Sequence, residues 1–150
     1  MRPFLFFILL VTSISACSPI QSNLQTSQNS FNSSFDYDTF IDNKIEYNNL
    51  FSISKQGYFV YIYSLNCLHC KNIKQTVLGF LAIHQESFFL LEFSKDIPLL
   101  DDVSTTIGKD DYLYFGIMGT PTLIYIYNRK IEMNISGEDM IVTFLTTCST

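Results

Sequence analysis

The hydrophobic and polar positions after residue 34 follow two alternating patterns along the chain. Three short, nearly continuous apolar runs are rich in β-branched and aromatic residues, which is typical of strands buried on both faces of a sheet. They cover residues 58–63, 87–94 and 122–127. A weaker run at residues 131–135 follows the third after a short turn, which predicts that the last two strands form a hairpin.

Between these runs, apolar residues recur at helical spacing. A first helix is predicted within residues 35–53, where Asp36 or Asp38 can cap its start. A second helix begins at the cysteine pair of residues 67–70 and runs to His84. The other predicted helices are short segments at residues 100–106 and 111–115 and a closing helix at residues 138–145. The alternation of helices and strands predicts an α/β fold in which both faces of the sheet are covered.

The N-terminal residues show a separate pattern. Arg2 is followed by an apolar run at residues 4–11 that is too short to span a bilayer, which is typical of a secretory signal peptide. The next residues, Ile14-Ser15-Ala16-Cys17, resemble the lipobox of bacterial lipoproteins. This resemblance implies cleavage before Cys17 and acylation of its thiol, so residues 1–16 are predicted to be a lipoprotein signal peptide. An ordinary cleaved signal with a chance cysteine is the alternative.

Residues 17–34 consist mainly of Ser, Asn, Gln and Thr and show no apolar period. Such a segment buries too little surface to offset the entropy of ordering it, so we predict a flexible tether that starts at the lipidated Cys17. Residues 35–150 then form a single domain, of a size at which one hydrophobic core is usual. We therefore expect an extracytoplasmic protein that is lipid-anchored to a bacterial membrane.

The charge of the chain excludes some classes of partner. The predicted mature chain lacks Arg2 and has 8 Lys and Arg residues against 14 Asp and Glu residues, a formal charge of −6. This acidic balance argues against nucleic-acid binding and against electrostatic docking on anionic lipid. The lipid anchor, and not a basic patch, is expected to hold the protein at the membrane.

The segment Cys67-Leu68-His69-Cys70 stands where the first predicted strand ends and a helix begins. At a helix start, unpaired backbone N–H groups and the positive end of the helix dipole stabilise a thiolate and lower the thiol pKa below its usual value of about 8.5. The two-residue spacer lets Cys70 reach back to Cys67 within one helical turn. One sulfur is then an accessible nucleophile and the other resolves the mixed disulfide that it forms, so the segment predicts thiol–disulfide exchange.

A second motif, Gly119-Thr120-Pro121-Thr122, immediately precedes a predicted strand. A proline at the start of a strand can follow a cis peptide bond. Placed beside a reactive disulfide, it would present the backbone of Thr120 for strand-like pairing with a substrate peptide.

These features in this order resemble the thioredoxin superfamily over nearly all of residues 35–150. The resemblance implies a thioredoxin fold with a central mixed sheet flanked by helices and a C-terminal β-hairpin plus helix. It also implies that Cys67 is the attacking thiol, Cys70 the resolving thiol and Pro121 a cis proline. The segment VYIYSLNCLHC (residues 60–70) is similar to small extracytoplasmic thioredoxin-like lipoproteins, including bacteriocin transport accessory proteins, a likeness confined to that segment.

The chain departs from cytoplasmic thioredoxin at two positions. Asn66 stands where a tryptophan usually precedes the first cysteine, and Tyr61 stands where a buried carboxylate helps the resolving cysteine lose its proton. The missing carboxylate argues against a fast general reductant. His69 before the second cysteine resembles protein disulfide isomerase and a periplasmic disulfide oxidase, in which that histidine stabilises the reduced thiolate. Thr120 before the proline resembles the isomerase as well, so an oxidant or isomerase is favoured over a reductant.

Other interpretations of the cysteine pair are open. A purely structural disulfide would stabilise the fold weakly, because a two-residue loop closes little chain entropy. A zinc site formed by Cys67, His69 and Cys70 would lack a further ligand that structural zinc requires. The side chain of His69 either tunes the thiolate or lies exposed in the spacer. We expect neither a metal nor a cofactor.

The sequence therefore predicts a membrane-anchored thiol–disulfide oxidoreductase that acts on secreted or envelope proteins. Cys67 and Cys70 would exchange disulfides, His69 would tune them, and Thr120 and Pro121 would hold the substrate backbone. The expected partners are protein thiols and disulfides, together with a membrane protein that transfers electrons to or from the pair. The alternative is a non-catalytic binding or accessory module of a peptide secretion system.

Overall fold

The structure is a computed structural model that describes residues 34–148. The predicted signal peptide (residues 1–16), the lipidation site Cys17 and all but the last residue of the predicted tether lie outside the described residues. Within the described part, no helix is both long enough and apolar enough to cross a membrane.

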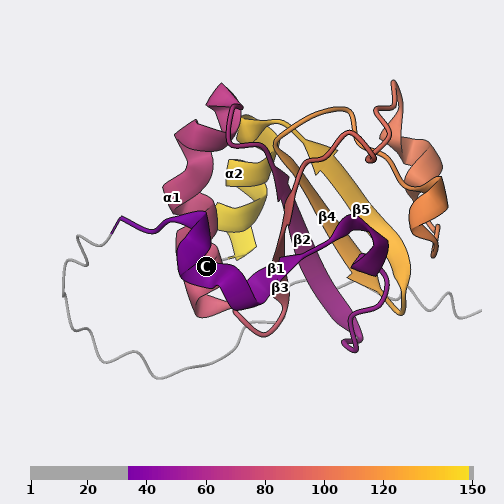
Figure 1. The fold of residues 1–150 in the computed structure, drawn as a ribbon, viewed down its shortest axis with the longest axis horizontal. Coiled ribbons are helices and arrows are strands. Elements are labelled where there is room, and N and C mark those ends of the chain that lie inside the picture. Colours follow the sequence, from indigo (N-terminus) through magenta and orange to yellow (C-terminus); the bar gives the residue numbers. More distant parts are fainter. Residues whose placement is uncertain (1–33, 149–150) are drawn as a thin grey trace, which may run out of the picture.

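A five-stranded mixed sheet forms the centre of the domain, with the strand order β1-β3-β2-β4-β5 (Figure 1). Strands β1 and β2 run parallel to β3, whereas β4 runs antiparallel to both β2 and β5. The three predicted buried strands and the C-terminal hairpin are confirmed. The strand bounds are Lys44–Ile45 (β1), Gly57–Tyr63 (β2), Phe88–Glu92 (β3), Thr122–Tyr127 (β4) and Lys130–Ser136 (β5).

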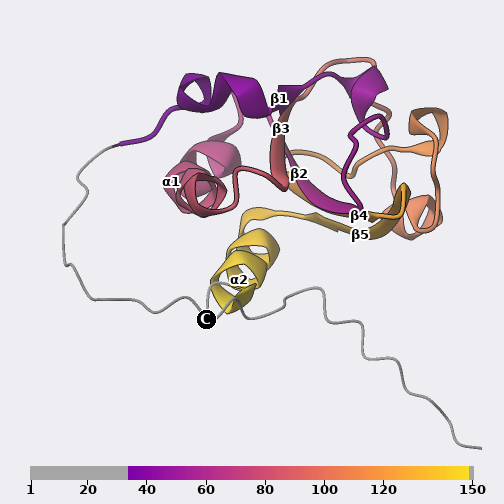
Figure 2. The same cartoon turned by 90° about the horizontal axis from the view of Figure 1, so that it is seen from below.

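Both α-helices, α1 (Leu68–Ile83) and α2 (Glu138–Cys148), cover the same face of the sheet (Figure 2). They contact each other, and their apolar side chains pack on the side chains that β2, β3 and β4 direct toward them. This first core cluster includes Tyr61, Leu90 and Leu123 from the sheet, Val77 and Leu81 from α1, and Ile141 and Leu145 from α2.

The opposite face of the sheet is covered by irregular chain and single helical turns. Its core cluster joins Val60, Ile62 and Ile124 of the sheet to Leu50, Ile97, Phe115 and Ile117 from the covering segments. The helices predicted at residues 100–106 and 111–115 form there as 3-10 turns, η3 (Val103–Thr106) and η4 (Tyr112–Tyr114). Each turn is capped by an aspartate, Asp102 or Asp111, whose carboxylate accepts a backbone N–H two residues later.

The prediction of an α-helix within residues 35–53 is wrong. The chain instead forms the 3-10 helix η1 (Tyr37–Asn43), the short strand β1 and a second 3-10 turn, η2 (Tyr47–Asn49). The buried residues of η1 are Tyr37, Phe40 and Asn43, whose spacing of three matches the 3-10 repeat.

Asn43 supplies the physical reason for this departure. Its amide Nδ2 donates hydrogen bonds to the backbone oxygens of Gln85, at 2.6 Å, and Phe88, at 2.9 Å. These two bonds fix the end of η1 beside β3, so that the following residues pair with β3 as β1. A long-range contact of this kind is not encoded in the local apolar spacing.

We predict that Asn43→Ala lowers the free energy of unfolding by about 1–3 kcal/mol, because it leaves two carbonyl oxygens without their side-chain donor. Urea denaturation of the two proteins measures the difference. Asn48→Ala, at an exposed position of η2, is the matched control and should change stability little. Equal stability of Asn43→Ala and wild type would show that the bonds from Asn43 do not hold β1 in place.

Candidate active site

Cys67 lies just beyond the C-terminal end of the central strand β2 and is the N-cap residue of α1. The two neighbours of β2 in the sheet run in opposite directions: β3 is parallel to β2, and β4 is antiparallel to it. The Cys67 backbone is extended, and its sulfur accepts a hydrogen bond from the backbone N–H of Cys70 at 3.1 Å. A side chain that accepts such a bond satisfies one of the free N–H groups of a helix start.

The two cysteines are free thiols in unequal surroundings. The Cys67 sulfur is partly exposed and donates a hydrogen bond to the backbone oxygen of Thr120 at 3.2 Å. Cys70 is 1% exposed and belongs to the core cluster beneath α1. An external disulfide can therefore reach Cys67 but not Cys70.

The same surroundings separate the pKa values of the two thiols. Burial would raise the pKa of Cys67, but hydrogen bonds from the Cys70 thiol, the Thr120 side chain and the backbone N–H groups at the helix start outweigh it, so that pKa is lowered. Burial raises the pKa of Cys70 to about 11, and its hydrogen bond to Cys67 acts in the same direction. Cys67 therefore becomes a thiolate first, while Cys70 keeps its proton.

The Thr120–Pro121 motif lies directly against the cysteine pair, as the contact between Cys67 and Thr120 shows. The peptide bond between Thr120 and Pro121 is cis. The motif is fixed at its C-terminal side: the Thr122 hydroxyl donates to the oxygen of Gly119 at 2.6 Å, and the Pro121 oxygen accepts the N–H of Gly137 at 2.9 Å. The first bond closes the motif on itself, and the second ties it to the end of the hairpin.

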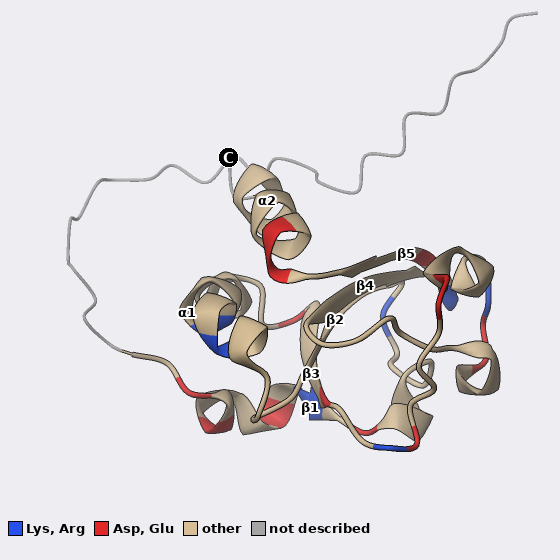
Figure 3. Cartoon of the chain, turned by 90° about the horizontal axis from the view of Figure 1, so that it is seen from above, with Lys and Arg blue, Asp and Glu red and all other residues tan. Residues whose placement is uncertain are grey.

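The side chain of His69 is 65% exposed and contacts the first residue of α2, Glu138. Its Nδ1 lies 3.1 Å from Oε2 of Glu138, and Nδ2 of Asn72 donates to the same oxygen at 3.1 Å. Glu138 belongs to the acidic first turn of α2, red in Figure 3. The hydrogen bonds from Asn72 and His69 lower the pKa of Glu138. What His69 contributes directly to Cys67 is its backbone N–H.

Sequence reasoning missed the contacts of Glu138 and Asn72. The acidic helix start at residues 138–139 is visible in the sequence, but its position beside the cysteine spacer follows from the packing of α2 on α1. Cys67, Cys70, Thr120 and Pro121 are brought together as predicted, whereas the His69 side chain is directed elsewhere.

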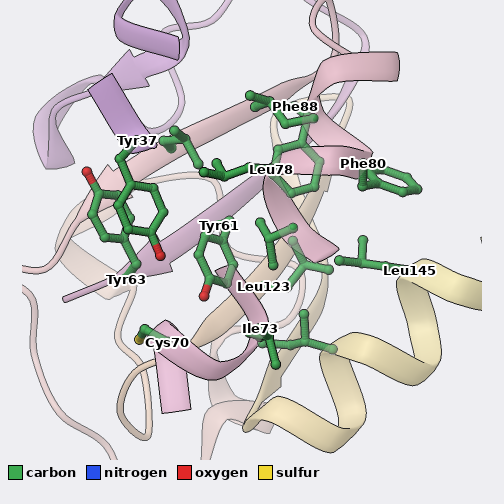
Figure 4. Packing of buried hydrophobic residues seen from close by; sticks show 14 of the residues in the cluster. Tyr37, Tyr61, Tyr63, Cys70, Ile73, Leu78, Phe80, Phe88, Leu123 and Leu145 are labelled. Atoms are coloured by element: carbon green, nitrogen blue, oxygen red, sulfur yellow. The ribbon is translucent and has the colours of Figure 1, made fainter. Parts of the chain in front are cut away.

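A group of three buried tyrosines beneath the site was also missed (Figure 4). Tyr37 stacks on Tyr63 with ring centroids 3.8 Å apart, and Tyr61 lies beside this stack with its hydroxyl on the side of Cys70. The hydroxyls of all three are buried without a hydrogen-bond partner of regular geometry. The sequence indicates only that Tyr61 stands in place of a carboxylate, and not that it belongs to this group.

Several apolar residues close to Cys67 or to the proline motif in the chain are exposed. Leu65 and Leu68 flank Cys67 in the chain and are 54% and 68% exposed, and Met118, two residues before Thr120, is 56% exposed. Exposed large apolar side chains that form a contiguous patch are typical of a contact surface for other proteins. In residues 34–148, no group of three or more His, Cys, Asp or Glu side chains is arranged to hold a metal ion.

No protein-family model and no curated protein matches the chain. Solved structures that resemble it include thioredoxin f2 of Chlamydomonas reinhardtii (12% identity, TM-score 0.45, covering 69% of this chain and 93% of that one). Thioredoxin f from spinach chloroplast shares 12% identity with a TM-score of 0.48 and covers 72% of this chain and 93% of that one. Plasmodium falciparum thioredoxin shares 12% identity with a TM-score of 0.46 and covers 69% of this chain and 96% of that one.

The fold itself is defined by the order and direction of its strands. A central strand with one parallel and one antiparallel neighbour leads into a helix that begins at the cysteine pair. The proline motif opens the antiparallel strand opposite that pair, and a hairpin and a helix complete the domain. The chain has a thioredoxin-like α/β fold.

Proposed function

We propose that the protein is a thiol–disulfide oxidoreductase that exchanges disulfides with other proteins. The observation that carries this proposal is the inequality of its two thiols. Cys67 is accessible and has a lowered pKa, whereas Cys70 is buried beside it with a raised pKa. A structural pair would need neither accessibility nor this difference in acidity.

The reaction proceeds in two exchange steps. The Cys67 thiolate attacks one sulfur of a substrate disulfide, so that a mixed disulfide forms and the other substrate sulfur leaves as a thiolate. Cys70 then loses its proton and attacks the Cys67 sulfur, which forms the Cys67–Cys70 disulfide and releases the second substrate thiolate. The two electrons lost by the cysteine pair reduce the substrate, and the reverse sequence oxidises it.

The surroundings of Cys67 favour an extended peptide substrate. Thr120 offers a backbone edge next to the sulfur, and strand-like pairing to such an edge gives affinity without a requirement for particular side chains. The apolar rim formed by Leu65, Leu68 and Met118 adds contacts that an unfolded or partly folded segment can make.

We predict that Cys70→Ser traps substrate proteins as mixed disulfides on Cys67, because the resolving thiol beside Cys67 is removed. Non-reducing electrophoresis of the variant should show adducts that a reductant removes. Cys67→Ser is the control and should trap few or none, since the remaining Cys70 thiol is buried. The absence of adducts from both variants would contradict disulfide exchange.

We also predict the pH dependence of the first step. Only the thiolate attacks, so the rate of Cys67 alkylation by iodoacetamide rises with pH and reaches half its maximum below the usual thiol value of about 8.5. Below that midpoint Cys67 is protonated and the rate falls. In Cys67→Ser, burial still raises the pKa of Cys70, so no fast alkylation that depends on Cys70 is expected near pH 7. A midpoint at or above about 8.5 would contradict the stabilised thiolate.

As to direction, we propose that the pair acts as an oxidant or isomerase. Hydrogen bonds that lower the pKa of Cys67 stabilise the reduced form of the pair. When the reduced form is stabilised, the corresponding disulfide is a stronger oxidant, as in the strongly oxidising thiol–disulfide oxidoreductases. His69 contributes its N–H to this effect, and its side chain links the spacer to Glu138.

We predict that the Cys67–Cys70 pair equilibrates with glutathione at a potential of about −120 to −180 mV. The measurement uses the fraction oxidised at a series of glutathione ratios, and a Cys67→Ser, Cys70→Ser double variant corrects for Cys17 and Cys148. A potential near −270 mV would show a thioredoxin-like reductant instead.

The proposed location is extracytoplasmic, with a lipid anchor on Cys17. The support is the sequence alone: the short apolar run, the lipobox-like residues 14–17 and the polar tether that follows. A protein at that location would exchange disulfides with secreted or envelope proteins and with a membrane electron-transfer protein. The trapping experiment also tests this location. Adducts of Cys70→Ser should be found in the membrane fraction, and adducts of a Cys17→Ser, Cys70→Ser variant should not.

A further inference from the structure

In the second exchange step, a thiol in the interior of the protein has to lose its proton. Cys70 has to become a nucleophile, although burial raises its pKa to about 11. The nascent thiolate lies in the core cluster with 1% of its residue surface exposed, where water solvates it poorly. A hydrogen-bond donor inside the protein would lower the barrier, because an unpartnered buried charge is costly.

Tyr61 is placed to supply that donor. It projects from β2 toward the start of α1, and Figure 4 shows its hydroxyl on the side of Cys70. The residue is 0% exposed, and its hydroxyl has no hydrogen-bond partner of regular geometry in the described part of the protein. Most buried hydroxyls are paired, so an unpaired one beside a reactive sulfur calls for an explanation.

The ionisable groups around the Tyr61 hydroxyl come from two elements, η1 and α1 with its N-cap. Cys70 belongs to α1 and Tyr37 to η1, and both interact with that hydroxyl. Cys67, the N-cap of α1, accepts the backbone N–H of Cys70 at 3.1 Å. Lys74 of α1 lies over the ring of Tyr37, with its Nζ 4.9 Å from the ring centroid.

Burial raises the pKa of Tyr61 far above its ordinary value, and Tyr37 and Cys70 raise it further. The hydroxyl therefore keeps its proton at any pH at which the protein works. A group that stays protonated does not serve as a base, but it donates a hydrogen bond to a neighbouring sulfur. Such a bond is strongest when the acceptor carries a negative charge.

We propose that the buried hydroxyl of Tyr61 donates a hydrogen bond to the sulfur of Cys70 as Cys70 attacks the mixed disulfide, and so sets the rate of resolution. This inference rests on the proposed function and adds a residue to its second step. The proton of Cys70 passes to solvent, and the new bond joins the sulfurs of Cys70 and Cys67. The bond from Cys67 to the substrate sulfur breaks, and the substrate leaves as a thiolate that takes up a proton. Tyr61 keeps its own proton throughout.

The experiment follows both steps in one reaction. The reduced full chain is mixed with dithiobis(nitrobenzoate), which releases one coloured thiolate when Cys67 attacks and a second when Cys70 resolves the mixed disulfide. The second phase is assigned by its absence from Cys70→Ser. A Cys67→Ser, Cys70→Ser double variant gives the contribution of the other cysteines. The rate of each phase is then measured as a function of pH.

Tyr61→Phe should leave the first phase unchanged and slow the second about tenfold at neutral pH, the effect expected for one hydrogen bond to a charged group. The pH midpoint of the second phase should rise by about one unit. Tyr63→Phe is the matched control. Tyr63 lies on the same strand and is equally buried, and its hydroxyl also lacks a hydrogen-bond partner of regular geometry in the described residues, but the ionisable groups that act on it are Lys44, Glu92 and Asp38 and not Cys70. It should change neither phase.

A second phase of Tyr61→Phe with the rate and midpoint of wild type would overturn the proposal while leaving disulfide exchange intact. Slowing of both phases together with a lowered melting temperature would overturn it too, because it would show a packing role. The expected melting temperature of Tyr61→Phe equals or exceeds that of wild type, since the change removes an unpaired buried hydroxyl. Wild type without a phase that depends on Cys70 would contradict the exchange function itself, and the role of Tyr61 with it.

Discussion

The burial of β2 on both faces is the constraint on which the rest of the structure depends. Residues 60–63 of this strand have no exposed surface, and their side chains alternate between the two core clusters. The strand can therefore neither shift along its neighbours nor rotate without exposing one set of side chains. Because its position is fixed, the short turn that follows it delivers Cys67 to one place, where α1 begins and Thr120 lies within hydrogen-bond distance.

The position of Cys67 at the start of α1 determines how the two thiols differ in exposure and acidity. The N-cap position leaves the Cys67 sulfur at the surface among N–H donors, and three residues later the helix has turned Cys70 into the core. The core at that point consists of tyrosine rings in place of aliphatic side chains. Their stacking supplies packing, while their hydroxyls keep polar atoms near the buried sulfur at the cost of unpaired donors.

The sequence was sufficient for the features that depend on local pattern. Continuous apolar runs located β2, β3 and β4, and the two-residue spacing of the cysteines at a helix start located the accessible thiol. It was insufficient where a side chain acts over a long distance. Asn43 converts an apparently helical stretch into η1 and β1 by bonding to the backbone near β3. His69 turns toward Glu138, 69 residues later, because α2 packs beside α1. Nor did the sequence place the Tyr61 hydroxyl beside Cys70, since that requires knowing which face of β2 the helix covers.

The unequal covering of the two sheet faces has a consequence for how the protein opens locally. Regular helices that share a large apolar contact resist local unfolding more than irregular chain and single 3-10 turns do. Both sulfurs belong to the layer with the regular helices, whereas the chain that leads up to Thr120 runs through the irregular layer, past η4 and Phe115. The segment that leads to Thr120 is thus drawn from the less stable part of the domain, and the two sulfurs from the more stable part. An adaptable backbone edge next to a fixed thiol would suit the proposed disulfide exchange with proteins of different shapes.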